Sequence, residues 1–412
     1  MRFPLQRSIT LLAVLLIFGC TSSPHDQSHR VDETNYLQVT LGASLEDDKS
    51  NEPYRFWGDA IPKALASNEN EGFDQQRVDN LTSSKNGPQV FGDTFNVLVL
   101  SGGGPRGAFG AGVLNGLNDS GNLPEYSLIT GVSAGALIAP FVFVGGDKID
   151  QMKQVMLGLD DDKMLGGTSF FSFLFGDAFS EGNNFYQMIS EIYNDDFIVK
   201  IAKQHRAGRR LFIGTTHFDS GRQMIWNLGR IADSDLPNKS ELIHQILTAS
   251  SSIPGVFPPQ FIPVNFEGTT LEEMHVDGGL SNQLFFDPIG FDYTSFVRSL
   301  GIDNAPQVYT IRNGRLRTEF KFIEDDTISL ASRSIDNLIL AQTRGDVVRE
   351  VYVTERIGAH FFLTYVDDDY TDKPAEGKFF DSAYLKTLYD YGYNKGINNQ
   401  AWVDKLPLTV RD

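Results

Sequence analysis

The 412-residue sequence has little cysteine, comparatively few basic residues and no long apolar run. Its one cysteine, Cys20, cannot form a disulfide within the chain or a zinc site that needs several cysteines. The 35 lysines and arginines are outnumbered by 53 acidic residues, so the net charge is −18. Because such a charge repels phosphate backbones, the composition argues against a nucleic-acid-binding protein. With 41% hydrophobic and 21% charged residues, the chain is otherwise typical of globular proteins.

A short apolar run lies near the N-terminus, at residues 9–18, and is interrupted only by Thr10. Arg2 and Arg7 precede this run, and residues 1–19 contain no acidic side chain. A helix that spans a membrane needs roughly 20 apolar residues, so this run is too short for one. The pattern predicts a signal peptide over residues 1–19.

The position of Cys20 indicates which kind of signal peptide this is. Residues 17–20, Ile-Phe-Gly-Cys, resemble the lipobox of bacterial lipoproteins, with Phe18 where a small residue is usual. The resemblance implies that Cys20 is the lipidated first residue of the mature chain, and Thr21 after it resembles lipoproteins sorted to an outer membrane. We therefore expect a lipid-anchored protein of the bacterial cell envelope, on the outer membrane and facing the periplasm. An ordinary cleaved signal peptide is the alternative.

The mature chain divides into three stretches by composition. Residues 20–92 are mostly polar and read as a lipidated tether and N-terminal extension. Order is expected from the apolar run 96–100, and residues 96–290 alternate strand-like and helical patterns, which is typical of an α/β fold with a mostly parallel sheet. Residues 291–412 form a C-terminal extension that we expect to complete or cover this core.

A glycine-rich turn follows the first expected strand. Residues 102–107 read Gly-Gly-Gly-Pro-Arg-Gly and open a helical pattern. A dinucleotide site would need an acid at the end of the next strand, which instead ends in Thr130 and Gly131, and a P-loop would need a Lys-Ser/Thr ending. Backbone N–H groups at such a turn stabilise negative charge, on either a phosphate or an oxyanion.

A second motif favours the oxyanion. Residues 131–135 read Gly-Val-Ser-Ala-Gly between a strand and a helix, the context of a nucleophile elbow with Ser133 at its tip. A serine hydroxyl needs a base within hydrogen-bond reach. Asp277, followed by Gly278 and Gly279, supplies a carboxylate 144 residues later. Taken alone, Asp-Gly-Gly is also compatible with a simple turn.

These three motifs, complete and in order, resemble those of the patatin-like phospholipase family over residues 96 to about 290. The resemblance implies a three-layer α/β sandwich with a mostly parallel central sheet and helices on both faces. It also implies a catalytic dyad of Ser133 as nucleophile and Asp277 as base, with no cofactor or metal. The implied oxyanion donors are the backbone N–H groups of Gly102, Gly103 and Gly104. The other motif positions are Arg106, Gly107, Gly131, Gly135, Gly278 and Gly279.

The positions of the histidines bear on whether the site is a Ser-Asp dyad or a Ser-Asp-His triad. An α/β-hydrolase triad would run Ser, Asp, His along the chain, an order that Ser133, Asp277 and His360 satisfy. His360 begins an apolar strand-like run, however, where a structural role is expected. His275 lies two residues from Asp277 and therefore on the same strand face.

The sequence thus favours a lipid acyl hydrolase of the phospholipase A or esterase type, acting on a lipid or phospholipid ester and held at a membrane by its N-terminal lipid. Two alternatives stay open. One is a general esterase or acyltransferase for small soluble esters. The other is a non-catalytic scaffold or binding lipoprotein that keeps the fold.

Overall fold

The computed structural model describes residues 27–42, 52–62, 65–67, 72–84, 87–90, 92–161, 182–286 and 293–406. The expected signal peptide and Cys20 lie outside these residues.

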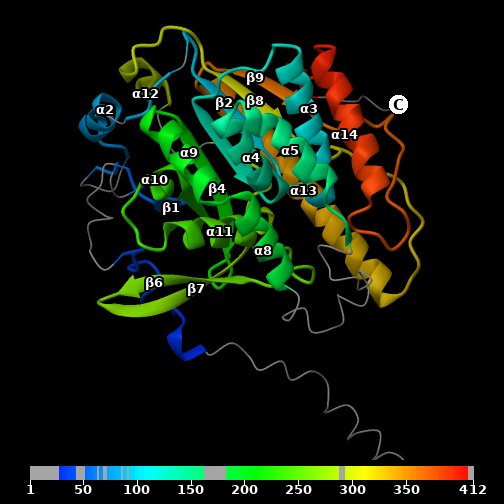
Figure 1. Cartoon of the computed structure of the whole chain (residues 1–412), viewed down its shortest axis with the longest axis horizontal. Coiled ribbons are helices and arrows are strands. Elements are labelled where there is room, and N and C mark those ends of the chain that lie inside the picture. The colour runs from blue at the N-terminus through cyan, green and yellow to red at the C-terminus, as the bar shows by residue number, and fades with distance from the viewer. Residues whose placement is uncertain are drawn as a thin grey trace, which may run out of the picture.

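A nine-stranded sheet organises the described part of the chain (Figure 1). Its strands are β1 Arg55–Trp57, β2 Asn96–Leu100, β3 Leu128–Val132, β4 Arg210–His217, β5 Arg222–Asn227, β6 Gln260–Phe266, β7 Thr269–Asp277, β8 Gln307–Ile311 and β9 His360–Thr364. The order is β1-β5-β4-β3-β2-β8-β9, and β7 pairs with both β4 and β6. The central strands β4, β3, β2, β8 and β9 run parallel, whereas β1, β5, β6 and β7 join by antiparallel pairing.

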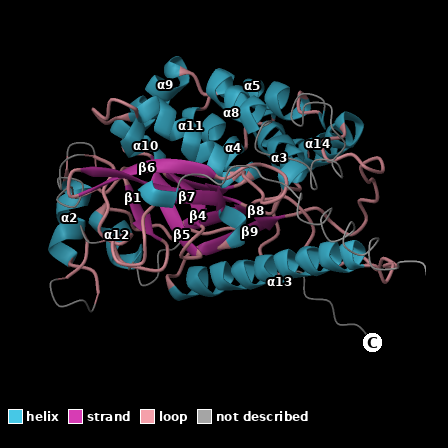
Figure 2. Ribbon diagram, turned by 90° about the horizontal axis from the view of Figure 1, so that it is seen from below, coloured by secondary structure: helices cyan, strands magenta, loops and turns pink. Residues whose placement is uncertain are grey.

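Helices cover both faces of this sheet (Figure 2). They are α2 Gln75–Ser83, α3 Gly107–Asp119, α4 Ala134–Val144, α5 Asp147–Leu157, α8 Gly182–Ile192, α9 Asp195–Arg206, α10 Leu228–Ala232, α11 Lys239–Ser250, α12 Tyr293–Ser299, α13 Thr327–Arg356 and α14 Ser382–Ile397, with short 3₁₀ turns η1 Gln27–His29, η3 Gly104–Arg106 and η5 Gly278–Leu280. Figure 2 shows α2, α12 and α13 on one side of the sheet and the other helices mainly on the opposite side. The predicted α/β sandwich with a mostly parallel central sheet and helices on both faces is therefore confirmed.

Along each central strand, successive side chains face the two opposite sides of the sheet, and each side has its own apolar core. In β3, Ile129 belongs to the core under α3, α4 and α5, whereas Leu128 belongs to the core on the α2 and α13 side. In β4, Leu211 faces the first core and Phe212 packs against the second. Successive side chains point to opposite faces of a strand, so strands covered on both sides are apolar throughout.

Helices α3 and α14 meet along a seam of glycines. A Cβ atom on Gly112 would lie 2.1 Å from the Tyr389 carbonyl oxygen, and one on Gly116 would lie 2.3 Å from the Tyr393 carbonyl oxygen. Gly392 is equally close to the backbone of α3. Because no side chain fits at these positions, the two helix backbones touch, and the C-terminal helix packs directly on the helix that follows the glycine-rich turn.

The C-terminal residues are part of this architecture. Strand β8 pairs with β2 and β9 pairs with β8, so both extend the parallel sheet beyond the first strand of the core. Helices α8 and α9 are separate, because the side chain of Asn194 caps α9 by accepting a hydrogen bond from the Phe197 N–H.

Candidate active site

Ser133 lies at the sharp turn between β3 and α4. Its φ of 53° and ψ of −124° are unusual for a residue with a side chain, and this strain is characteristic of a nucleophile elbow. The turn is closed by glycines, since a Cβ on Gly131 would lie 2.6 Å from the Gly135 carbonyl oxygen. The Ser133 N–H donates to the hydroxyl of Ser250, which itself donates to the Gly214 carbonyl. The backbone of the elbow is therefore fixed in the position that presents the Ser133 hydroxyl.

The Ser133 hydroxyl donates a hydrogen bond to Asp277 Oδ2 over 2.7 Å. The other carboxylate oxygen of Asp277 accepts the Gly279 N–H, also over 2.7 Å. Ser133 is 4% exposed and Asp277 is 5% exposed, so this pair is largely shielded from water. The carboxylate is thus held by one fixed donor while its second oxygen faces the serine.

Sheet pairing brings these distant residues together. Asp277 ends β7 opposite Thr215 of β4, and Gly214 of β4 lies opposite Val132 of β3. The next residue after Val132 is Ser133. Both side chains therefore emerge at the carboxyl end of the parallel strands, the edge at which α/β proteins commonly place their sites.

Burial raises the pKa of Asp277 from 3.8 to about 7, although the hydrogen bonds from Ser133 and from the Gly279 N–H act in the opposite direction. A carboxylate with this pKa is a much stronger base than an exposed aspartate. It is therefore suited to accept a proton from a serine hydroxyl near neutral pH.

The two histidines considered from the sequence lie elsewhere. His360 begins β9 and is paired with Gln307 at the amino end of the strands, the edge opposite Ser133. His275 is fully buried and bonds to Thr215 Oγ1 through Nδ1 and to Glu273 through Nε2. Burial lowers the pKa of His275. Neither ring contacts the Ser133 hydroxyl in the described structure, where this hydroxyl bonds to Asp277.

The glycine-rich turn lies beside Ser133, but its three glycines are not equivalent. The Gly102 N–H donates to the Gln283 carbonyl over 3.0 Å, so it does not offer the free oxyanion donor expected from the sequence. Within the described residues, the N–H groups of Gly103 and Gly104 have no acceptor. Gly104 has a φ of +54°, a conformation that favours glycine. The structure thus leaves two amides available for a developing negative charge.

Residues after β8 hold this turn in place, and sequence reasoning did not identify them. Asn313 donates to the Ser101 carbonyl and accepts the Gly110 N–H, while Arg312 donates to the Gly102 carbonyl over 3.0 Å. Burial, and then the nearby charge of Arg106, lower the pKa of Arg312 to about 9. Arg312 places a buried cation behind the turn.

The remaining motif positions are mostly structural. Arg106 is exposed at the end of η3, consistent with a surface role. Close packing explains the others, because a Cβ would lie under 3.0 Å from a neighbour at Gly107, Gly131, Gly135, Gly278 and Gly279.

An apolar pocket opens beside the Ser133 hydroxyl. Its space, including the opening to solvent, measures about 410 Å³. Its lining includes Leu137, Met156, Phe185, Ile253, Phe257, Phe379 and Phe380. Such a lining suits a hydrocarbon chain whose ester carbonyl reaches Ser133. Phe379 and Phe380 come from the C-terminal extension, which therefore contributes to the pocket.

A buried carboxylate fixes these two phenylalanines. The oxygens of Asp161, which is 5% exposed, accept the N–H groups of Phe379 over 3.1 Å and Phe380 over 2.6 Å. The Phe379 ring lies against the glycine-rich turn, since a Cβ on Gly104 would be 3.4 Å from its Cζ. No sequence pattern relates Asp161 to residues more than 200 positions later, so only the structure identifies this contact.

The described residues offer no cluster suited to a metal ion. Among them, no group of three or more histidine, cysteine or acidic side chains could hold one. The acidic run at 367–369 bonds instead to Tyr391 and Lys395 through Asp367.

The part of the chain that carries this site matches a known protein family. Residues 98–289 match the family described as Patatin-like phospholipase. No curated protein matches the chain. Among solved structures, VipD from Legionella pneumophila is 15% identical, with a TM-score of 0.36 and coverage of 74% of this chain and 66% of that chain. The type III effector protein ExoU is 13% identical, with a TM-score of 0.30 and coverage of 75% and 53%. The chain thus spans less than two thirds of the length of each of these structures.

The matched range begins in β2 and ends after Asp277, so it contains the glycine-rich turn, the elbow and the carboxylate. Residues 98–289 of this chain are a patatin-like phospholipase domain.

Proposed function

We propose that the protein hydrolyses lipid esters through an acyl-enzyme formed on Ser133, with Asp277 as the base. The phospholipase domain supports lipid hydrolysis as the general activity. The observation that carries the finer proposal is the 2.7 Å hydrogen bond from the Ser133 hydroxyl to Asp277, in a buried site beside an apolar pocket.

In the first step, Ser133 Oγ attacks the ester carbonyl carbon while its proton passes to Asp277. The carbonyl oxygen becomes negatively charged and accepts hydrogen bonds from the N–H groups of Gly103 and Gly104. One such donor typically lowers the barrier by roughly 3–4 kcal/mol. The ester C–O bond then breaks, and the alcohol leaves with the proton from Asp277. An acyl group now remains on Ser133.

Water completes the cycle. Asp277, ionised again, accepts a proton from a water molecule that attacks the acyl carbon. The second tetrahedral intermediate uses the same two amides, and its collapse returns the proton to Ser133 and releases the fatty acid. No step requires a metal or a redox cofactor.

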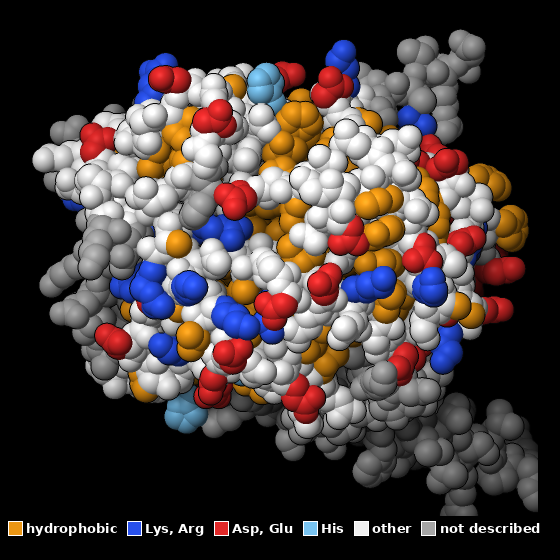
Figure 3. All heavy atoms as spheres, turned by 45° about the horizontal axis from the view of Figure 1, so that its top comes forward, with side chains coloured by type: hydrophobic (Ala, Val, Ile, Leu, Met, Phe, Trp, Pro, Cys, Tyr) orange, Lys and Arg blue, Asp and Glu red, His pale blue; other side chains and the backbone are white. Residues whose placement is uncertain are grey.

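A membrane location follows from the same proposal, together with the N-terminal sequence. Within the described chain, no helix combines the length and apolar character needed to cross a membrane. On the face shown in Figure 3, acidic and basic side chains are mixed with apolar ones, so that face offers no uniformly basic surface for anionic lipid. We propose that acyl chains on Cys20 anchor the protein in the bacterial envelope, on the periplasmic side of the outer membrane.

The decisive test is covalent labelling. The full-length protein is treated with a fluorophosphonate probe and the labelled peptide is identified by mass spectrometry. We expect one adduct on Ser133, absent in Ser133→Ala. A folded protein that fails to label would contradict the catalytic proposal and favour a non-catalytic scaffold.

Substrate class and anchoring need separate measurements. Comparing phospholipid vesicles with p-nitrophenyl esters of increasing chain length distinguishes a lipid hydrolase from an esterase for small soluble substrates. Mass spectrometry of the mature N-terminus tests the anchor, which predicts an acylated Cys20. An unmodified N-terminus elsewhere would refute that part alone.

A further inference from the structure

A second apolar cavity lies on the opposite face of the sheet from α4. Its space, including the opening to solvent, measures about 860 Å³, roughly twice that of the pocket beside Ser133. The mechanism proposed above makes no use of it.

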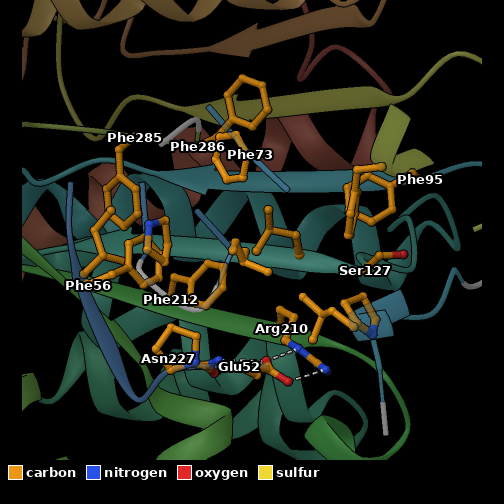
Figure 4. A pocket seen from close by; sticks show the side chains of 18 residues that line it. Glu52, Phe56, Phe73, Phe95, Ser127, Arg210, Phe212, Asn227, Phe285 and Phe286 are labelled. Atoms are coloured by element: carbon orange, nitrogen blue, oxygen red, sulfur yellow. Dashed lines mark hydrogen bonds and ion pairs between the residues drawn. The ribbon is translucent and has the colours of Figure 1, made fainter. Parts of the chain in front are cut away.

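The cavity is formed between the sheet and residues outside its central strands (Figure 4). Leu128, Phe212 and Ile225 of β3, β4 and β5 contribute from the sheet. The other walls come from edge strand β1, from other residues that precede β2 and from the segment after Asp277, and they are rich in aromatic rings: Phe56, Phe73, Phe95, Phe285, Phe286 and Phe296. A well-packed core would fill such a space, because empty apolar volume is destabilising.

One end of the cavity is polar, and its charges are already paired. The carboxylate of Glu52 forms an ion pair with Arg210, whose Nη2 donates to Glu52 Oε2 over 2.7 Å. Asn227 donates to the other Glu52 oxygen over 2.8 Å, and both bonds are drawn in Figure 4. The remaining guanidinium nitrogen of Arg210, Nη1, donates to the carbonyls of His205 and Arg209. This end therefore presents a neutral, hydrogen-bonded surface.

Ser127 provides a polar atom without a partner. It lines the cavity next to Arg210, whose N–H donates to the Ser127 carbonyl. Ser127 is 2% exposed, and its hydroxyl has no hydrogen-bond partner among the described residues. A buried hydroxyl without a partner is costly, so this atom is a natural contact for a ligand oxygen.

We propose that this cavity binds one single-chain, uncharged lipid with a hydroxyl head group, such as a fatty alcohol or a monoacylglycerol. The hydrocarbon chain lies among the phenylalanine rings, and the head group exchanges a hydrogen bond with Ser127 Oγ. A fatty-acid anion binds less well, because its carboxylate would meet Glu52 beside an arginine that is already neutralised. The site is separate from Ser133 and does not depend on the proposed reaction.

The first test measures binding of 1-dodecanol to the full-length protein by calorimetry. Ile225→Phe fills the cavity from the sheet, and Leu137→Phe is the matched change in the pocket beside Ser133. We expect Ile225→Phe to lose one bound dodecanol per chain that Leu137→Phe retains. Because the added ring enters empty space, the melting temperature of Ile225→Phe should not fall. Retained binding in that variant, or loss in Leu137→Phe alone, would overturn the proposal.

The second test addresses the head group at pH 8. Dodecanol should bind about tenfold more tightly than dodecanoate, a difference of about 1.4 kcal/mol. Glu52→Gln keeps the shape but leaves Arg210 without its counter-charge, so this variant should reverse the preference. If wild-type protein binds dodecanoate as tightly as dodecanol, the charge argument fails.

A third variant tests the hydroxyl contact and does not depend on filling the cavity. Ser127→Ala should weaken dodecanol binding about fivefold, the effect of one hydrogen bond, and leave binding of dodecane unchanged. Equal losses for both ligands, or no loss for dodecanol, would contradict the role of Ser127. Labelling of Ser133 reports on the proposed reaction independently, so the two hypotheses can fail separately.

Discussion

Replacing Asp277 with asparagine should abolish activity and at the same time stabilise the protein. The pKa of Asp277 is about 7, against 3.8 for an ordinary aspartate. At pH 8 the folded protein therefore holds a buried carboxylate that would ionise more easily in the unfolded chain. The difference between these two pKa values corresponds to about 4 kcal/mol.

The pH dependence gives this prediction its sign. Below about pH 4 the carboxyl is protonated in both states, and its ionisation costs the folded protein nothing. Between 3.8 and about 7 the unfolded chain loses the proton first, so the stability of the wild type falls as the pH rises. Above about pH 7 this loss of folding stability is complete. A neutral asparagine at this position would avoid the loss, so the advantage of Asp277→Asn should be absent near pH 4 and reach about 2–4 kcal/mol at pH 8.

Chemical unfolding of wild type and Asp277→Asn across pH 4–8, with ester hydrolysis in parallel, measures both effects. Glu273→Gln is a control of opposite sign on the same strand. Glu273 is equally buried, but Arg55 and His275 hold its pKa at about 2, so its neutralisation should destabilise the protein at pH 8. A destabilised Asp277→Asn at pH 8, or one that keeps more than about 10⁻³ of the activity, would refute the reasoning.

Three further predictions concern the same site. For wild-type protein, kcat/KM should rise about tenfold per pH unit below 7 and level off above it, since the base must be ionised; a profile flat from pH 5 to 8 would contradict this role of Asp277. Phe379→Ala should enlarge the pocket and raise the preference for decanoyl over butyryl p-nitrophenyl esters about tenfold, while the exposed Phe320→Ala leaves the ratio unchanged; an unchanged ratio in Phe379→Ala would remove Phe379 from the pocket wall. His360→Ala should keep most of the activity, because His360 is exposed at the other edge of the sheet, and inactivity of the folded variant would point to a triad.

The sequence predicted the parts of the site that are encoded locally. A glycine-flanked serine between a strand and a helix determines its own backbone conformation, and Ser133 has the strained geometry that this pattern requires. The α/β alternation likewise predicted the layers, because strands covered on both faces must be apolar throughout.

Contacts between distant segments could not be predicted in this way. The Gly102 N–H donates to the Gln283 carbonyl, and the Phe379 N–H donates to the carboxylate of Asp161. Each depends on how the chain returns to the sheet edge, which periodicity does not encode. The place of His360 was ambiguous for the same reason, since chain order does not say at which end of a strand a residue lies.

The glycine seam between α3 and α14 means that the boundaries of the family match are not those of a folding unit. A fragment ending at residue 289 would lack β8, which would leave the hydrogen-bonding edge of β2 unpaired. It would also lack α14, which would expose the surface of α3 around Gly112 and Gly116. It would also lose Arg312 and Asn313, which hold the glycine-rich turn. Removal of the last helix alone should therefore disturb catalysis from the far end of the chain, through the helix that begins where the glycine turn ends.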